Sequence, residues 1–268
     1  MHDIHVVINK NMKHFKFTIA AFVITCFVLI ITTASKNKPI EEFHIPTTDS
    51  NGFVIMELFT SQGCSSCPPA DNLLGKYANM GNTNIIPLAF HVDYWNRLGW
   101  TDSFSSFKYS QRQRDYAMII DGSSVYTPQL VINGEKEFVG SDAGKISAAV
   151  NNGLKMKADI LISIDKIEKK GKSITVNFSF DKIIMHSRIQ AALVQKQVLT
   201  NILKGENRGL KLINYNVVRD FNSLSTGNNP ASISLNMPAG YKDSDFTIVL
   251  FVQDDASGRV IGAVQKTL

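Results

Sequence analysis

Apolar runs and amphipathic stretches alternate along the first half of the chain. The run 53–59 is apolar on both faces and bounded by turn residues, which predicts a strand in a sheet covered on both sides. Asn133-Gly134 is a strong hairpin signal. The predicted elements are strand 53–59, helix 70–78, strand 84–92, helix 103–120 with Ser103 as its N-cap, strands 129–134 and 135–139, and helix 141–153. The predicted order is β-α-β-α-β-β-α.

The pattern changes in the second half. From Ala158 onward apolar positions alternate with a period of two, and the sequence contains no long amphipathic helix. Ile174, Val176 and Phe178, for example, put apolar side chains on one face, as a half-buried strand does. Two pairs of such segments are separated by short turns: 160–167 with 174–180, and 246–253 with 259–265. This pattern predicts a mostly β second half of about six to eight strands arranged as a sandwich.

The amino end has the pattern of an export segment. Three lysines precede an apolar run over residues 17–31, and small residues follow at positions 34 and 35. The length of the run lies between that of a signal-peptide core and that of a relaxed membrane span, so cleavage and retention as a membrane tether both stay open. We expect an exported protein, periplasmic or in the cell envelope, that is either secreted or tethered by its N-terminal segment.

Composition and the change in hydrophobic periodicity together divide the chain into four parts. Residues 36–52 are polar and rich in turn-forming residues, which predicts a linker. The predicted organisation is a signal peptide or membrane anchor over residues 1–35, the linker over 36–52, a first folded domain over 53–154 and a second over 157–268.

The charge pattern gives no support for nucleic acid binding. The formal net charge is +5, and residues 1–35 hold three lysines and one aspartate, which leaves +3 for the rest of the chain. The basic residues are scattered instead of forming a stripe that could follow a phosphate backbone. We expect no nucleic acid partner.

Two cysteines, Cys64 and Cys67, stand between the first predicted strand and the first predicted helix. The unpaired N–H groups and the dipole of a helix N-terminus favour negative charge, so Cys64 is expected to form a thiolate readily. Cys67 would then resolve a mixed disulfide formed at Cys64. A disulfide across two residues constrains the unfolded chain little, so stabilisation is a weak reason for the pair. A redox couple, a structural disulfide and a metal site all stay open.

Thr127 and Pro128 directly precede a predicted strand in the β-β-α part. This arrangement resembles the thioredoxin superfamily, which implies a cis bond at Pro128 that faces the cysteines and a substrate groove lined by Thr127 and Pro128. Residues 57–71, 90–95, 98–100, 125–129, 205–209 and 214–219 are similar to the secreted thioredoxin-like family catalogued as domain of unknown function 1223. The resemblance and the element order imply an α/β thioredoxin-like N-terminal domain followed by a mostly β, sandwich-like C-terminal domain.

The segment after the second predicted strand supplies further candidate site residues. The carboxyl ends of strands in an open α/β sheet share one edge, so we expect His91, Asp93 and Trp95 beside Cys64. His91 would donate to the thiolate or carry a proton near neutral pH, while Asp93 and Trp95 would orient it or bind substrate. The alternative is a capped strand end with packed aromatic rings.

Glu57 lies within an otherwise apolar strand. Burial there would raise the pKa of its carboxyl group and let it take the proton of the resolving thiol, a role similar to that of the buried acid in thioredoxins. The alternative is an ion pair with Arg112 or Arg114.

These observations lead to two main hypotheses. The first is an exported thiol–disulfide exchange protein that acts on protein or small-molecule thiols and disulfides, exchanges electrons with a further redox partner, and has no resident cofactor or metal. The alternative is a copper-binding or metal-delivery module that uses Cys64, Cys67 and His91, because thiolates and imidazole suit Cu(I). A structural exported module with an inert disulfide is a third possibility.

Overall fold

The computed structural model describes residues 52–268 except 121, 123 and 183. All the described residues belong to one compact unit. The predicted export segment and nearly all of the predicted linker therefore lie outside the described residues. Over the described range, no helix combines the length and apolar character needed to cross a membrane.

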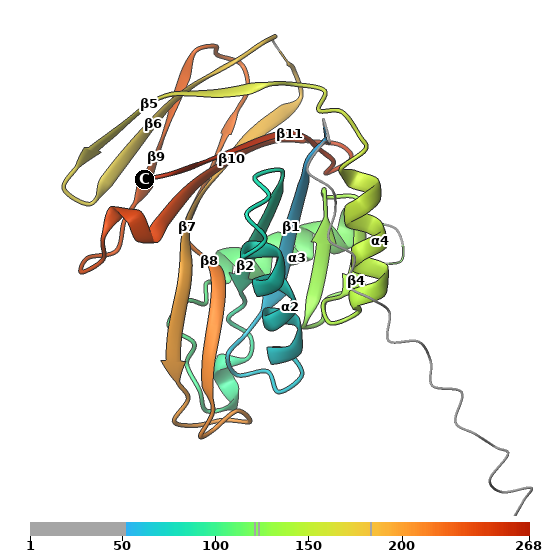
Figure 1. Cartoon of the computed structure of the whole chain (residues 1–268), viewed down its shortest axis with the longest axis vertical. Coiled ribbons are helices and arrows are strands. Elements are labelled where there is room, and N and C mark those ends of the chain that lie inside the picture. The colour runs from blue at the N-terminus through green and yellow to red at the C-terminus, as the bar shows by residue number, and fades with distance from the viewer. Residues whose placement is uncertain (1–51, 121, 123, 183) are drawn as a thin grey trace, which may run out of the picture. The chain divides into compact units, whose positions relative to one another are not determined.

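The described residues form eleven strands, three α-helices and two short 3-10 helices (Figure 1). In chain order they are β1 (Val54–Thr60), α2 (Pro68–Ala78), β2 (Ile85–His91), η1 (Asn96–Leu98), α3 (Phe107–Ile119), β3 (Gln129–Ile132), β4 (Lys136–Val139), α4 (Ala143–Gly153), β5 (Ile162–Lys170), β6 (Ser173–Phe180), β7 (Ser187–Asn201), β8 (Lys211–Ser225), β9 (Ala231–Asn236), η2 (Asp243–Asp245), β10 (Phe246–Asp254) and β11 (Val260–Thr267). The strands and α-helices from β1 to α4 follow each other in the predicted order.

The predicted fold class is wrong. The protein is mostly β, and it is not an α/β thioredoxin-like domain followed by a separate sandwich. Eight strands make one mixed sheet in the order β11-β10-β7-β8-β2-β1-β3-β4, and β5-β6-β9 make a second sheet. The strands of the first half of the sequence are joined to those of the second half by a parallel pairing of β2 with β8, at Ala89 and Val217. Strands from both halves of the sequence therefore share one sheet.

Burial explains why β2 needs this neighbour. All seven residues of β2 are buried, and its other edge pairs with β1. Buried backbone N–H and C=O groups must find hydrogen-bond partners, so β2 could not remain a free edge. The long antiparallel pair β7 and β8, which run side by side in Figure 1, extends the sheet at this position.

The large sheet is covered on both faces. One face carries α3, and the cluster beneath it takes residues from β1, β2, β7 and β10, including Phe59, Phe90 and Phe251. The opposite face of β1, β2 and β3 packs against α2 and α4. Residues at alternate positions of β7 and β10 point toward the three-stranded sheet and pack against it. Leu193 of β7 and Phe178 of β6, for example, belong to the same apolar cluster. The three-stranded sheet therefore packs on an extension of the large sheet, and not on the second sheet of a separate sandwich domain as predicted.

Gly75 sets how closely α2 approaches β8. A Cβ atom at position 75 would lie 2.4 Å from the ring of Tyr215. We expect Gly75→Ala to lower the free energy of unfolding by about 1–3 kcal/mol, because added volume at a tight contact forces neighbours apart. Urea unfolding measures the loss. Gly227→Ala is the matched control, since among the described residues no atom lies within 4 Å of its added Cβ; equal stability of the two variants would contradict the tight contact.

Candidate functional site

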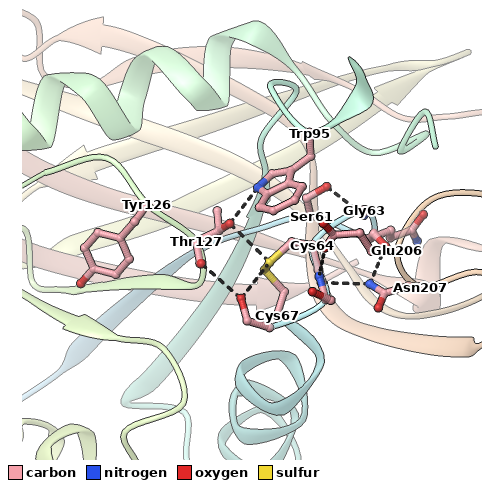
Figure 2. Close-up of a disulfide and its surroundings, with 12 residues drawn as sticks. Ser61, Gly63, Cys64, Cys67, Trp95, Tyr126, Thr127, Glu206 and Asn207 are labelled. Carbon is pink, nitrogen blue, oxygen red and sulfur yellow. Dashed lines mark hydrogen bonds between the residues drawn. A yellow bond between two sulfur atoms is a disulfide. The ribbon is translucent and has the colours of Figure 1, made fainter. Parts of the chain in front are cut away.

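Cys64 and Cys67 form a disulfide at the start of α2 (Figure 2). Cys67 is the N-cap residue of α2, and two prolines occupy the first helical positions. Both cysteines are 0% exposed, whereas the two serines between them are exposed. The disulfide therefore lies directly beneath a surface turn, at the helix end where negative charge is favoured.

One wall of the site comes from Thr127 and Trp95. The Thr127–Pro128 peptide bond is cis, as the resemblance implied. The Thr127 hydroxyl donates to Cys64 Sγ at 3.4 Å, and the indole N–H of Trp95 donates to the same hydroxyl at 2.8 Å. Pro128 is buried, while Thr127 and Trp95 are half-buried. The structure thus brings Thr127 and Trp95 to the disulfide, and Pro128 follows Thr127 in the chain.

The opposite wall comes from the β7–β8 loop, residues 202–210. The side-chain amide of Asn207 donates to the carbonyl oxygens of Gln62 and Cys64, both at 2.9 Å. The Glu206 carboxylate accepts the backbone N–H of Ser65 at 3.1 Å. In Figure 2, Glu206 and Asn207 lie on the side of the disulfide away from Thr127. A loop about 140 residues later in the chain therefore fixes the backbone around Cys64.

His91 is fully buried at the end of β2, and its partner is Asp102. Nδ1 of His91 lies 2.7 Å from Oδ2 of Asp102, which also accepts the Gln62 N–H at 2.8 Å. Burial alone would disfavour the protonated ring, but the charge and hydrogen bond of Asp102 outweigh this effect and raise the pKa of His91. Burial also opposes the charge of Asp102, yet His91 and the backbone N–H groups of Gln62 and Phe104 lower its pKa. Two hydrogen bonds to Asp102, one from His91 and one from the backbone N–H of Gln62, therefore connect His91 with the cysteine loop.

Asp93 does not pair with His91. Its carboxylate accepts the hydroxyl of Ser110 at 2.5 Å, and its backbone N–H donates to Ser110 Oγ at 3.0 Å. These two bonds join the segment after β2 to α3. Asp93 therefore has the structural role that was the alternative in the sequence analysis, at a capped strand end. Trp95, two residues later, contacts the site.

Glu57 is fully buried in β1 and pairs with Arg112 on α3. Arg112 donates from Nε to Oε2 at 2.5 Å and from Nη2 to Oε1 at 2.8 Å. The Tyr116 hydroxyl also donates to Glu57. Glu57 therefore forms the ion pair with Arg112 that was the alternative in the sequence analysis. This pair lies in the core beneath α3.

Sequence reasoning missed Asp71. It lies on α2 one helical turn after Cys67, is 4% exposed, and donates its backbone N–H to the Cys67 carbonyl. Burial is the largest influence on its carboxyl group and raises the pKa to about 7, against the lowering effects of His91 and Thr60. The spacing from Cys67 was a usable signal, because residues four apart share a helix face.

The contacts of Asp102, Glu206 and Asn207 left a weaker signal in the sequence. Glu206 and Asn207 stand in a glycine-flanked polar segment, residues 205–209, which was noted only as part of the family resemblance. Asp102 has no local pattern that points to His91.

The copper hypothesis needs Cys64, Cys67 and His91 as one ligand group. Among the residues that the structure describes, no three His, Cys, Asp or Glu side chains are grouped so that they could hold a metal ion. His91 is instead buried against Asp102.

Comparisons with known proteins place the chain in a family. An X-ray structure from Agrobacterium tumefaciens is similar over 81% of this chain and 93% of its own, with 27% identity and a TM-score of 0.61. HBP35 of Porphyromonas gingivalis is similar in fold over 83% of this chain and 77% of its own, with 18% identity and a TM-score of 0.55. No curated protein matches. Residues 55–253 match the family described as protein of unknown function DUF1223, and because this match spans well over half of the sequence, the chain belongs to that family.

Proposed function

We propose that this protein carries out thiol–disulfide exchange through Cys64 and Cys67. The observation that carries the proposal is a disulfide that closes a two-residue turn at a helix N-terminus. The Thr127 hydroxyl donates a hydrogen bond to the Cys64 sulfur of this disulfide. So short a loop gains little stability from cross-linking, whereas a helix N-terminus lowers the cost of a thiolate. This arrangement suits exchange better than a structural role.

The chemistry balances as two displacements. In the reduced protein, the Cys64 thiolate attacks a substrate disulfide; a bond forms to Cys64, and one substrate sulfur leaves as a thiolate. Cys67, once deprotonated, attacks the Cys64 sulfur, and the second substrate sulfur leaves as a thiolate. The protein gives up two electrons and the substrate gains them. Substrate thiols run the same steps in reverse.

Asp71 is the side chain that we assign to the proton of Cys67. Cys67 is 0% exposed, so its thiol has poor access to water. Asp71 lies one turn further along α2, and a pKa of about 7 lets its carboxyl group take up or release a proton near neutral pH. Glu57, assigned this role from the sequence, is instead engaged by Arg112.

The substrate and the compartment are part of the proposal. Both cysteines are covered, so a substrate must enter beside the exposed Ser65-Ser66 turn, where the half-buried Trp95 offers an apolar surface. We assign this role to a protein or small molecule that carries a thiol or disulfide, with a second protein or small thiol as the redox partner. The sequence of residues 1–35 supports export, which would place the reaction in an oxidising compartment outside the cytosol.

Replacing Cys67 with serine tests the proposal. In Cys67→Ser the second displacement cannot occur, so we expect Cys64 to accumulate as a mixed disulfide with oxidised glutathione or with a disulfide-bonded protein such as insulin. Mass spectrometry under non-reducing conditions measures the adduct. Cys64→Ser is the control and should form no such adduct. Absence of an adduct in Cys67→Ser, together with a Cys64 thiol that resists alkylation at neutral pH, would refute thiol–disulfide exchange.

A further inference from the structure

A chain of two hydrogen bonds ends on the sulfur of Cys64. The indole N–H of Trp95 donates to Thr127 Oγ1 at 2.8 Å, and Thr127 Oγ1 donates to Cys64 Sγ at 3.4 Å (Figure 2). Figure 2 shows the Trp95 ring and the Thr127 side chain on the same side of the disulfide. The sequence assigned both residues to substrate binding, and neither was expected to act on the cysteine itself.

The direction of this chain follows from the donor and acceptor groups. An indole nitrogen can only donate, so the Thr127 oxygen must be the acceptor from Trp95. The Thr127 hydroxyl then has one hydrogen to donate, and its two acceptors are Cys64 Sγ and the phenol oxygen of Tyr94, which also hydrogen-bonds to Thr127. A thiolate is the stronger acceptor of the two, and accepting a bond from Trp95 makes the hydroxyl a stronger donor. Trp95 therefore makes Thr127 a donor toward a charged sulfur.

We propose that Trp95 and Thr127 form a donor relay that stabilises negative charge on the Cys64 sulfur in the reduced protein, with Trp95 as a positioning residue. This inference rests on the proposed exchange function and deepens it. A donor held against a thiolate favours the ionised form, and hydrogen bonds to charged groups are stronger than those between neutral groups. The half-buried position of both residues limits competition from water.

Other polar and charged groups surround Cys64 and must stay constant in a test. Ser66 Oγ lies 3.4 Å from the sulfur, but Ser66 is exposed, so water competes with it. The Glu206 carboxylate on the β7–β8 loop opposes a thiolate, Asp71 lies on α2, and the His91–Asp102 pair lies behind Gln62. Replacing Thr127 or Trp95 changes none of these charges, so their effects cancel between variants.

Three variants test the relay in the reduced protein. Thr127→Val keeps the shape but removes the hydroxyl, and we expect the pKa of the Cys64 thiol to rise by about one unit. Thr127→Ser keeps the hydroxyl and should leave the pKa within a few tenths of a unit of the unmodified protein. Trp95→Phe keeps an aromatic ring but removes the N–H, and it should raise the pKa by about half a unit. The pH dependence of thiolate absorbance and of alkylation measures these values.

The reduction potential gives an independent measurement. A rise of about one unit in the pKa of Cys64 makes its ionisation tenfold less favourable, which destabilises the reduced protein relative to the disulfide. At a pH where Cys64 is ionised, the reduction potential of Thr127→Val should therefore fall by about 30 mV. Equilibration with a glutathione buffer measures it.

Trp100→Phe is the matched control, because the Trp100 N–H donates to Gln62 Oε1 at 3.2 Å and not to Thr127. Equal shifts in Thr127→Val and Thr127→Ser, or in Trp95→Phe and Trp100→Phe, would overturn the relay. The measurements use the protein alone, so they are independent of the trapping experiment: a relay without adducts would refute exchange, and adducts without these shifts would refute the relay.

Discussion

Replacing Arg112 with methionine is expected to lower the free energy of unfolding by about 3–5 kcal/mol. Arg112 is the ionic partner of Glu57, whose side chain is 0% exposed, and its removal would leave a carboxylate buried without a counter-charge. Burial alone opposes the charge on Arg112, but Glu57 outweighs this effect and raises the pKa of the guanidinium group. Arg112 therefore keeps its positive charge beside Glu57.

Aromatic packing adds to this loss. The guanidinium carbon of Arg112 lies 4.9 to 5.7 Å from the centres of four rings, which belong to Phe90, Tyr116, Phe221 and Phe251. Such contacts contribute most where water is excluded. Phe221 comes from β8 and Phe251 from β10, so Arg112 also ties α3 to the strands that extend the large sheet.

Guanidinium chloride unfolding measures the effect of Arg112→Met. The matched control is Arg188→Met, which removes an arginine from an exposed pair with Asp255 whose side chains are 59% and 41% exposed; it should cost under about 1 kcal/mol. The double variant Glu57→Leu with Arg112→Met should recover much of the loss, because two apolar side chains leave no unpaired charge. Equal stability of Arg112→Met and Arg188→Met would contradict the buried pair.

The extent to which the fold could be predicted depends on how local each signal was. The strands 54–60 and 85–91 were visible as apolar runs between turn residues. The start of α3 was misplaced: Ser106 is the N-cap, not Ser103, and its side chain accepts the N–H of Lys108. Several serines there can cap a helix, and the bond from the Ser106 N–H to the His91 carbonyl, a contact between distant segments, selects one of them.

The pairing of strands could not be predicted in the same way. A period of two, as in β6, identifies the buried face of a strand, but it does not say which strand lies beside which. The junction of β2 with β8 is a single parallel pair, Ala89 with Val217, and no local pattern marks it. Dividing the chain into two separately folded sheets was the natural consequence of reading each half alone.

The residues of the candidate site show the same difference between local patterns and contacts of distant segments. Cys64, Cys67, Thr127 and Pro128 were identified because they form short segments with a recognisable order. Asn207 and Asp102 were missed because their contacts with Gln62 join segments far apart in the sequence. Trp95 was identified as a site residue, but its bond to Thr127 depends on side-chain placement.

Asp71 should make stability fall as the pH rises. Its folded-state pKa is about 7, raised chiefly by burial, whereas an aspartate in the unfolded chain has a pKa of about 3.9. Both states are protonated below about pH 4, so the contribution of Asp71 is fully present there. Between about pH 4 and 7 the unfolded chain releases the proton first, and stability declines by up to about 4 kcal/mol. The raised pKa of His91 acts in the same direction.

Asp71→Asn removes this dependence, because asparagine resembles the protonated carboxyl group at every pH. We expect the variant to be close to the unmodified protein in stability at pH 4 and more stable at pH 8, by up to about 4 kcal/mol. Urea unfolding at a series of pH values measures the difference. Asp165→Asn, the same change at an exposed position on β5, should show no such gain. An Asp71→Asn variant without extra stability at pH 8 would contradict a buried acid that titrates near neutrality, and with it the proton role given to Asp71. If that role is correct, the stabilised variant should release mixed disulfides more slowly, since a buried Cys67 thiol has lost its nearby proton acceptor.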